Sequence, residues 1–114
     1  MKTENAVLAL AALAQPTRLD AFRLLIEAGP DGLAAGVIAR RLDVVASTLS
    51  HHLGLLENAN LIRSVRHGRK VIYTRDVDGI RTLLSFLTNE CCGGHPELCG
   101  ELDMNMASLV TDAA

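Results

Sequence analysis

The sequence predicts a mainly helical domain with one small β-hairpin, and three observations support this fold class. Apolar residues recur at helical spacing in five segments that span most of the chain. Two β-prone runs follow the fourth segment and flank Gly68. Aromatic residues make up only 3% of the chain, so the core must consist mainly of Leu, Val, Ile and Ala. We expect the order α-α-α-α-β-β-α within residues 1–90, followed by a C-terminal extension, residues 91–114.

Charge is distributed unevenly, although the net charge is only −2. Residues 40–75 hold seven Lys or Arg and two acidic residues, whereas residues 76–114 hold one Arg and seven acidic residues. A local basic patch matters more for phosphate binding than the charge of the whole chain. The central segment is therefore the candidate nucleic-acid-binding region.

The first two helices are separated by a clear boundary. Thr3 or Asn5 can cap a first helix that runs to about Ala14, and its Ala-rich surface allows another helix to approach closely. Pro16 fits the first turn of a second helix, where its missing N–H costs nothing, and Gly29 is a natural end. The second helix is expected to turn four apolar side chains inward: Leu19, Phe22, Leu25 and Ile26.

The apolar run 6–14 has the length of a signal-peptide core. However, Glu4 stands where a basic residue is expected, and the run leads directly into the second helix. We therefore interpret it as a buried or dimer-packed helix of a cytoplasmic protein. No stretch approaches the length of a transmembrane span, so no membrane partner is expected.

A short helix, a brief connector and a second helix follow in residues 34–58. The short helix, residues 34–42, ends with Arg40 and Arg41, which suit the helix dipole and are available to phosphate. The second helix starts near Ser47 and has one apolar stripe, formed by Leu49, Leu53 and Leu56. Its other faces carry short polar side chains that could reach base edges: Ser47, Thr48, Ser50, His51 and His52. The pattern predicts a helix-turn-helix, although an ordinary amphipathic helix with a Ser cap is the alternative.

Residues 61–75 predict a β-hairpin directly after the helix-turn-helix. Leu61 with Val65, and Val71 with Tyr73, are expected on its packed face. Its tip carries four basic or titratable side chains: Arg66, His67, Arg69 and Lys70. A basic hairpin in this place is a DNA-contacting wing, and the alternative is a charge-protected sheet edge.

The last helix, residues 76–89, has two adjacent apolar strips. One strip contains Val77, Ile80, Leu84 and Leu87, and the other contains Leu83 and Phe86. Such a helix has more apolar surface than one domain needs to bury, so we expect a homodimer through the first and last long helices.

All three cysteines fall in the window CCGGHPELC, as Cys91, Cys92 and Cys99. Clustered thiolates select soft ions in a reducing compartment. From the residues alone, four interpretations remain open: structural thiols, a zinc site completed by His95, a three-thiolate site for trivalent arsenic or antimony, and a redox disulfide.

Two stretches resemble the ArsR/SmtB family of bacterial metal-responsive repressors. These are LAALAQPTRLDAFRLL and STLSHHLGLLENANLIRSVRHGRKVIYTR, and the likeness covers roughly residues 8 to 87. The resemblance implies a homodimeric winged helix-turn-helix that binds a palindromic operator and leaves it when a metal or metalloid binds. It further implies that Ser47, Thr48, Ser50 and His51 face bases or phosphates. Arg66, Arg69 and Lys70 would be wing contacts.

The sequence departs from the family at two known sites. Ala34 and Gly36 stand where arsenic sensors of the family have Cys-x-Cys, and the last helix lacks the His of the zinc-type site, although Asp76 and Asp78 are present. Ala46 replaces a Gln that often precedes the Ser. The window CCGGHPELC instead resembles the C-terminal three-cysteine site of an arsenic-sensing subgroup, with Cys91, Cys92 and Cys99 as ligands.

These observations together predict a regulator of transcription and not an enzyme, because no acid–base or nucleophilic constellation is evident. We expect a repressor that dissociates from double-stranded operator DNA when arsenite binds; antimonite is a second candidate inducer. The alternative is the same DNA-binding dimer sensing zinc, cadmium or thiol oxidation.

Overall fold

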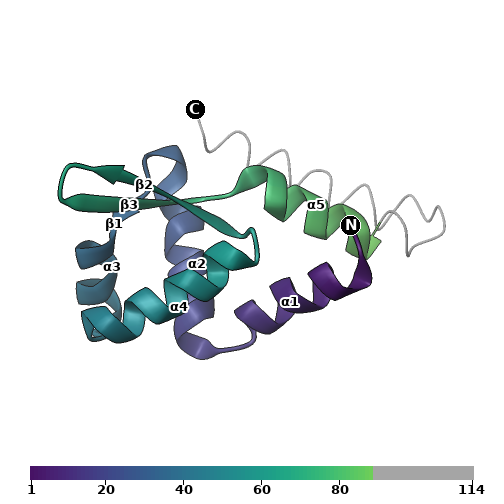
Figure 1. The fold of residues 1–114 in the computed structure, drawn as a ribbon, viewed down its shortest axis with the longest axis horizontal. Coiled ribbons are helices and arrows are strands. Elements are labelled where there is room, and N and C mark those ends of the chain that lie inside the picture. Colours follow the sequence, from purple (N-terminus) through teal and green to yellow (C-terminus); the bar gives the residue numbers. More distant parts are fainter. Residues whose placement is uncertain (89–114) are drawn as a thin grey trace.

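The computed structural model describes residues 1–88 and confirms the predicted fold class. Within these residues the chain is mainly helical, with a small antiparallel sheet (Figure 1). The elements in chain order are α1 (Thr3–Leu13), α2 (Pro16–Ala28), the 3-10 turn η1 (Gly29–Asp31), β1 (Leu33–Ala34), α3 (Ala35–Leu42), α4 (Ala46–Asn58), β2 (Ile62–His67), β3 (Lys70–Arg75) and α5 (Val77–Thr88).

The sheet has a third strand that the sequence did not predict. Its order is β1-β3-β2, and β1 pairs antiparallel with β3 through Leu33 opposite Tyr73 and Ala34 opposite Ile72. Ala34 was expected to begin the third helix, but it belongs to this strand. A strand of two residues has no periodicity of its own, so only its pairing with β3 defines it.

The hairpin has the predicted strands, but one of its expected core residues was wrong. Leu61 and Ile62 are buried, whereas Val65 is 52% exposed. Side chains alternate between the faces of a strand, so Ser64 shares the inner face with Ile62 and Val65 points outward. The two strands turn at Gly68, whose φ of 64° lies in the left-handed region that glycine tolerates.

The first two helices begin and end almost where the sequence indicates, but their caps differ. The N-cap of α1 is Lys2, which makes no side-chain cap bond, so capping by Thr3 or Asn5 was wrong. The N-cap of α2 is Gln15, whose Oε1 accepts a hydrogen bond from the backbone N–H of Arg18 at 2.8 Å. Leu19 was expected to face inward and is 43% exposed.

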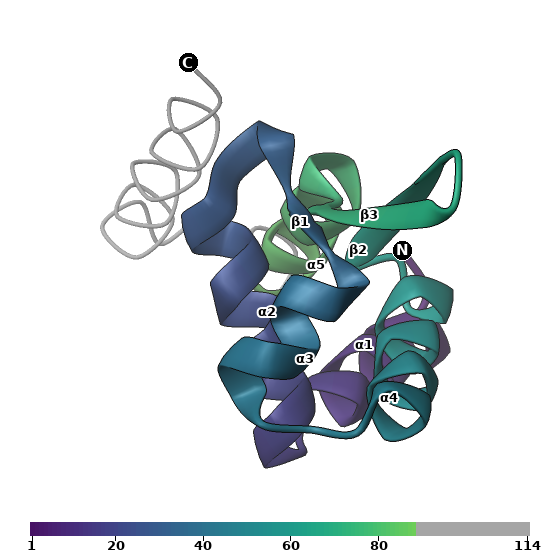
Figure 2. The same cartoon turned by 90° about the vertical axis from the view of Figure 1, so that its left-hand side faces the viewer.

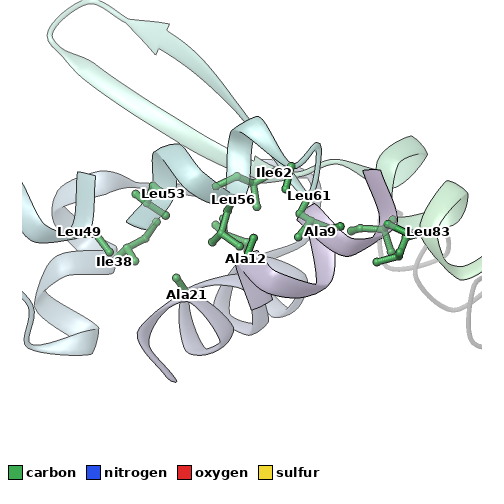
Figure 3. Close-up of a cluster of buried hydrophobic side chains, with 14 residues drawn as sticks. Ala9, Ala12, Ala21, Ile38, Leu49, Leu53, Leu56, Leu61, Ile62 and Leu83 are labelled. Atoms are coloured by element: carbon green, nitrogen blue, oxygen red, sulfur yellow. The ribbon is translucent and has the colours of Figure 1, made fainter. Parts of the chain in front are cut away.

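The core runs through all five helices and the start of β2 (Figure 3). In it, α1 packs against α2, α4 and α5, and contributes only small side chains: Ala6, Ala9 and Ala12. These alanines, which were expected to form a surface for a partner helix, are therefore buried inside the domain. The outward side of α1 carries larger apolar residues, namely Val7, Leu8 and Leu10, which are 57%, 53% and 43% exposed.

The turn that follows α4 and the start of α5 lie against each other. Asn60 has a φ of 62°, which confirms it as a left-handed stop after α4. A Cβ on Gly79 would collide with the backbone carbonyl of Asn60, so only glycine permits this close approach. Asp76 accepts a hydrogen bond from the N–H of Gly79 at 3.0 Å and thereby caps α5.

Candidate nucleic-acid interface

Helix α4 presents its short polar side chains outward because its leucines hold the opposite face in the core. Leu49, Leu53 and Leu56 are at most 1% exposed. The exposed polar residues in the first half of the helix are Ser47, Thr48, Ser50 and His51. Val45 is the N-cap and makes no side-chain cap bond, so the alternative role of Ser47 as a cap was wrong. The hydroxyl of Ser47 is thus not used to hold the end of its own helix.

The hairpin and α4 project on the same side of the molecule (Figure 2). The four predicted wing residues, Arg66, His67, Arg69 and Lys70, are all exposed. His67 pairs with Lys70 across the two-residue turn, and Arg66 pairs with Val71. The basic tip therefore extends beyond the part of the hairpin that packs on the domain, and a bound duplex could meet it together with α4.

An open cavity of about 390 Å³ separates the hairpin from the start of α3. It is lined by Ala34, Ala35, Gly36, Val37, Arg40, Arg69, Lys70 and Val71. Three of these side chains are cationic and none is acidic, so the cavity favours an anion such as a phosphate. The structure thus brings Arg40 together with two wing residues, whereas Arg41 and Arg66 are exposed outside this lining.

His52 differs from the other predicted contacts because it is half-buried. Its Nδ1 lies 3.1 Å from Nη1 of Arg18, and Nε of Arg18 donates to the carbonyl oxygen of Ala12 at 2.7 Å. Burial is the main cause that lowers the pKa of His52 below 6.5, and the nearby positive charges of Arg18 and His51 lower it further. Sequence reasoning missed Arg18, because 34 residues separate it from His52 and no local pattern connects them.

A second polar contact joins α4 to the wing. The hydroxyl of Ser64 in β2 donates to a carboxylate oxygen of Glu57 at 2.7 Å. Burial, and secondarily the charge of Glu57, raise the pKa of Tyr73 above 10.0, so this phenol stays protonated at physiological pH. Helix α4 is thus tied by side-chain hydrogen bonds to α2 near its middle and to the hairpin near its end.

The predicted ligands Cys91, Cys92 and Cys99 lie outside the described residues, as does His95. Within residues 1–88 there is no group of three or more His, Cys, Asp or Glu side chains that could hold a metal ion. Asp76, one of the two acidic residues at the family's zinc-type position, acts here as the cap of α5.

Comparisons with known proteins agree with this geometry. A family model described as a helix-turn-helix domain matches residues 13–65, which include α2, α3 and α4. The HTH-type transcriptional regulator YbzH of Bacillus subtilis, itself uncharacterised, is 31% identical over 90 residues; the aligned part covers 79% of this chain and 90% of YbzH. Such relatives are regulators of transcription and not enzymes.

Two solved structures illustrate the similarity of the fold. Reduced HlyU from Vibrio cholerae is 27% identical and has a TM-score of 0.61. The aligned part covers 79% of this chain and 92% of the HlyU chain. The homodimeric winged helix-turn-helix DNA-binding domain of Mb0332 from Mycobacterium bovis, described as a possible ArsR-family transcriptional regulator, is 23% identical. The TM-score is 0.62, and the aligned part covers 81% of this chain and 85% of the Mb0332 chain. This similarity supports the assignment of the fold.

No helix within residues 1–88 has both the length and the apolar character needed to cross a membrane.

Proposed function

This chain belongs to the helix-turn-helix transcriptional regulators, and we propose that it acts as a homodimeric repressor whose release from operator DNA is triggered by trivalent arsenic. The proposal has three parts: DNA reading by α4 and the wing, dimerisation through α1 and α5, and inducer binding by the C-terminal cysteines. Each part rests on different residues and can fail independently.

The observation that carries the DNA-binding part is the exposed polar half of α4 beside a cationic hairpin. Ser47, Thr48, Ser50 and His51 have the short donors and acceptors that base edges in the major groove require. Phosphate contacts come from the basic residues around them: Arg40, Arg41, Arg66, His67, Arg69 and Lys70. Polar contacts would then supply sequence preference, and the basic residues would supply affinity and salt dependence.

Support for the dimer comes from apolar surface that the domain does not bury. Val7, Leu8 and Leu10 of α1 are each more than 40% exposed, and Leu87 of α5 is 39% exposed. Since α1 contacts α5 near the N-terminal end of α1 (Figure 1), a second copy could cover both helices. Mb0332, which has this fold, is described as homodimeric. Two recognition helices at a fixed spacing would suit a palindromic site.

Support for arsenic as the inducer comes from the chemistry of the donor set. Cys91, Cys92 and Cys99 lie within nine residues, shortly after the described end of α5 at Thr88. Three thiols suit a pyramidal trivalent ion, since each S–H proton leaves with one arsenite hydroxyl as water while a sulfur–arsenic bond forms. Binding there would act on the far end of α5, and α5 contacts α1. A change in the dimer would move the two recognition helices relative to each other.

The decisive experiment follows the fluorescence anisotropy of protein-bound operator DNA during parallel titrations with arsenite, antimonite, zinc, cadmium and peroxide. We expect arsenite to release the DNA, and the C91S, C92S and C99S variants to retain it. Coupling is reciprocal, so DNA must weaken arsenite binding by the same factor as arsenite weakens DNA binding. A complex indifferent to arsenite, or a Cys variant that still dissociates normally, would overturn the inducer assignment.

Thiol oxidation is the second candidate signal, and the similarity to a structure of reduced HlyU favours including it. Peroxide would then release the DNA, and non-reducing mass spectrometry would show a loss of about two daltons per disulfide, the mass of two hydrogens. Release by zinc or cadmium that is lost in H95A would instead identify a Cys3His site.

A further inference from the structure

One arginine, Arg18, joins three helices of the domain. The Arg18 side chain starts from the first turn of α2. Its Nε donates to the carbonyl oxygen of Ala12 at the end of α1, at 2.7 Å, and its Nη1 lies 3.1 Å from Nδ1 of His52 on α4. The side chain is therefore fixed at two points by groups from two other helices. None of the DNA contacts described above includes Arg18.

The contact with Arg18 determines the protonation state of the imidazole. A guanidinium can only donate, so Nδ1 of His52 must accept, which leaves the ring neutral with its proton on Nε2. The groups that act on the ring agree with this assignment. Burial lowers the pKa of His52 most, and Arg18 from α2 and His51 on α4 itself lower it further. Helix α1 contributes the Ala12 carbonyl that holds Arg18.

We propose that Arg18 is a positioning residue for DNA recognition, which holds His52 in the neutral Nε2–H tautomer and ties α4 to the carboxyl end of α1. The DNA part of this proposal rests on the proposed function, whereas the tautomer does not. His52 is then a specificity residue with a single ring donor, and not a cation for phosphate.

The neutral tautomer matters because donor and charge select different DNA groups. An imidazolium would be attracted to any phosphate and would strengthen binding to all sequences alike. A single neutral N–H pairs only with an acceptor, and the major groove presents these at purine N7, guanine O6 and thymine O4. Arg18 therefore raises the preference for one sequence while adding no phosphate contact of its own.

The tautomer can be tested directly by NMR of the full chain labelled with nitrogen-15 in histidine. We expect the Nδ1 shift of His52 to be that of an unprotonated nitrogen and the Nε2 shift that of a protonated one. The titration midpoint of His52 should lie below 6.5, the ordinary pKa of an imidazole. In R18Q the shifts should become those of a tautomer mixture, and the midpoint should rise. A wild-type His52 that is an Nδ1–H tautomer, or whose midpoint is unmoved in R18Q, would overturn the proposal.

The DNA part is tested with a duplex that the wild-type protein selects from a randomised library, against a scrambled duplex of equal length. R18Q should lower the preference for the selected duplex about threefold to tenfold, the contribution of one hydrogen bond. H52N keeps an acceptor near the Nδ1 position but loses the Nε2 donor, so R18Q should cost nothing further in that background. H51N is the matched control, in which R18Q should cost as much as in the wild type.

The pH profile separates positioning from a merely structural role. Between about pH 5 and 8, acidification should reduce the preference of the wild type for the selected duplex. R18Q should lose this preference at a higher pH than the wild type. In H52N the preference should not change with pH in this range. Thermal melting of each variant corrects for any loss of folded protein. Additive effects of R18Q and H52N would overturn the positioning role. If no duplex were enriched, DNA recognition itself would be refuted, and the NMR result would decide the Arg18–His52 contact alone.

Discussion

Helices α1 and α4 each bury one face and expose another, but the kinds of side chain on the buried and exposed faces are opposite in the two helices. In α4, Leu49, Leu53 and Leu56 are buried and the short polar side chains are exposed. In α1 the alanines are buried, and the larger Val7, Leu8 and Leu10 are exposed. A polar exposed face is compatible with water or DNA, whereas a large apolar exposed face favours another protein. The comparison supports the proposal that α4 meets DNA and that α1 meets a second copy.

The largest effect is expected where α4 enters the core. Leu53 is fully buried, so L53A should lower the free energy of unfolding by about 2–5 kcal/mol. L55A, on the same helix, removes a side chain that is 37% exposed and should cost less than about 1 kcal/mol. Urea unfolding of both variants measures the difference. Equal losses of unfolding free energy in the two variants would mean that the buried leucines do not anchor α4 in the core.

The outward face of α1 is tested by introducing charge. L8E should weaken dimerisation by roughly 30-fold or more, the effect of removing an interface hot spot. V45E places the same charge on an apolar residue that is 71% exposed just before α4, and it should leave dimerisation unchanged. Sedimentation equilibrium reports both. A dimer unaffected by L8E would place the interface away from this face of α1.

The inward face of α1 is tested by adding volume. Ala9 is fully buried, so A9L should overpack the core and cost about 1–3 kcal/mol. A11L makes the same change at an exposed position of the helix and should be nearly neutral for folding. Thermal melting of the two variants compares them, and an A9L protein as stable as A11L would show that alanine is not required on the inner face.

The division of labour between α4 and the wing gives a smaller effect. S50A should reduce the preference for the selected duplex by about threefold to tenfold, with binding to scrambled DNA unchanged. R69A should weaken binding to both duplexes and reduce the slope of log affinity against log salt by about 1. Salt titrations with the two duplexes measure both quantities. The opposite assignment, with S50A changing the salt slope, would contradict the proposed roles.

The smallest effect concerns stability in acid. The pKa of folded His52 lies below 6.5, so at lower pH the unfolded chain binds a proton that the folded chain does not. This contribution to the free energy of unfolding is fully present above pH 6.5 and is lost as the pH falls through the folded pKa. The difference in melting temperature between wild type and H52N should therefore shrink on acidification. If the difference in melting temperature instead grew in acid, the pKa of His52 in the folded protein would be raised and not lowered.

Local patterns were sufficient wherever one strong signal fixed an element. Pro16 marks the start of α2, the leucine spacing gives the buried face of α4, and Asn60 ends it. The hairpin strands followed from their β-prone residues and from Gly68. The polar and basic residues of the candidate interface were also identified, because they contrast with an apolar neighbourhood. The cysteine site lies outside the described residues and stays a prediction.

By itself, then, the sequence determined the order of the helices and hairpin, and the charge and polarity of the surface proposed to meet DNA. Only the tertiary structure decided which face of α1 is buried, because a helix that is apolar on every side offers no contrast between inside and outside. It also decided that β1 exists, that Val65 faces outward, and that Arg18 meets His52. These features depend on residues far apart in the chain, and no local period encodes such contacts.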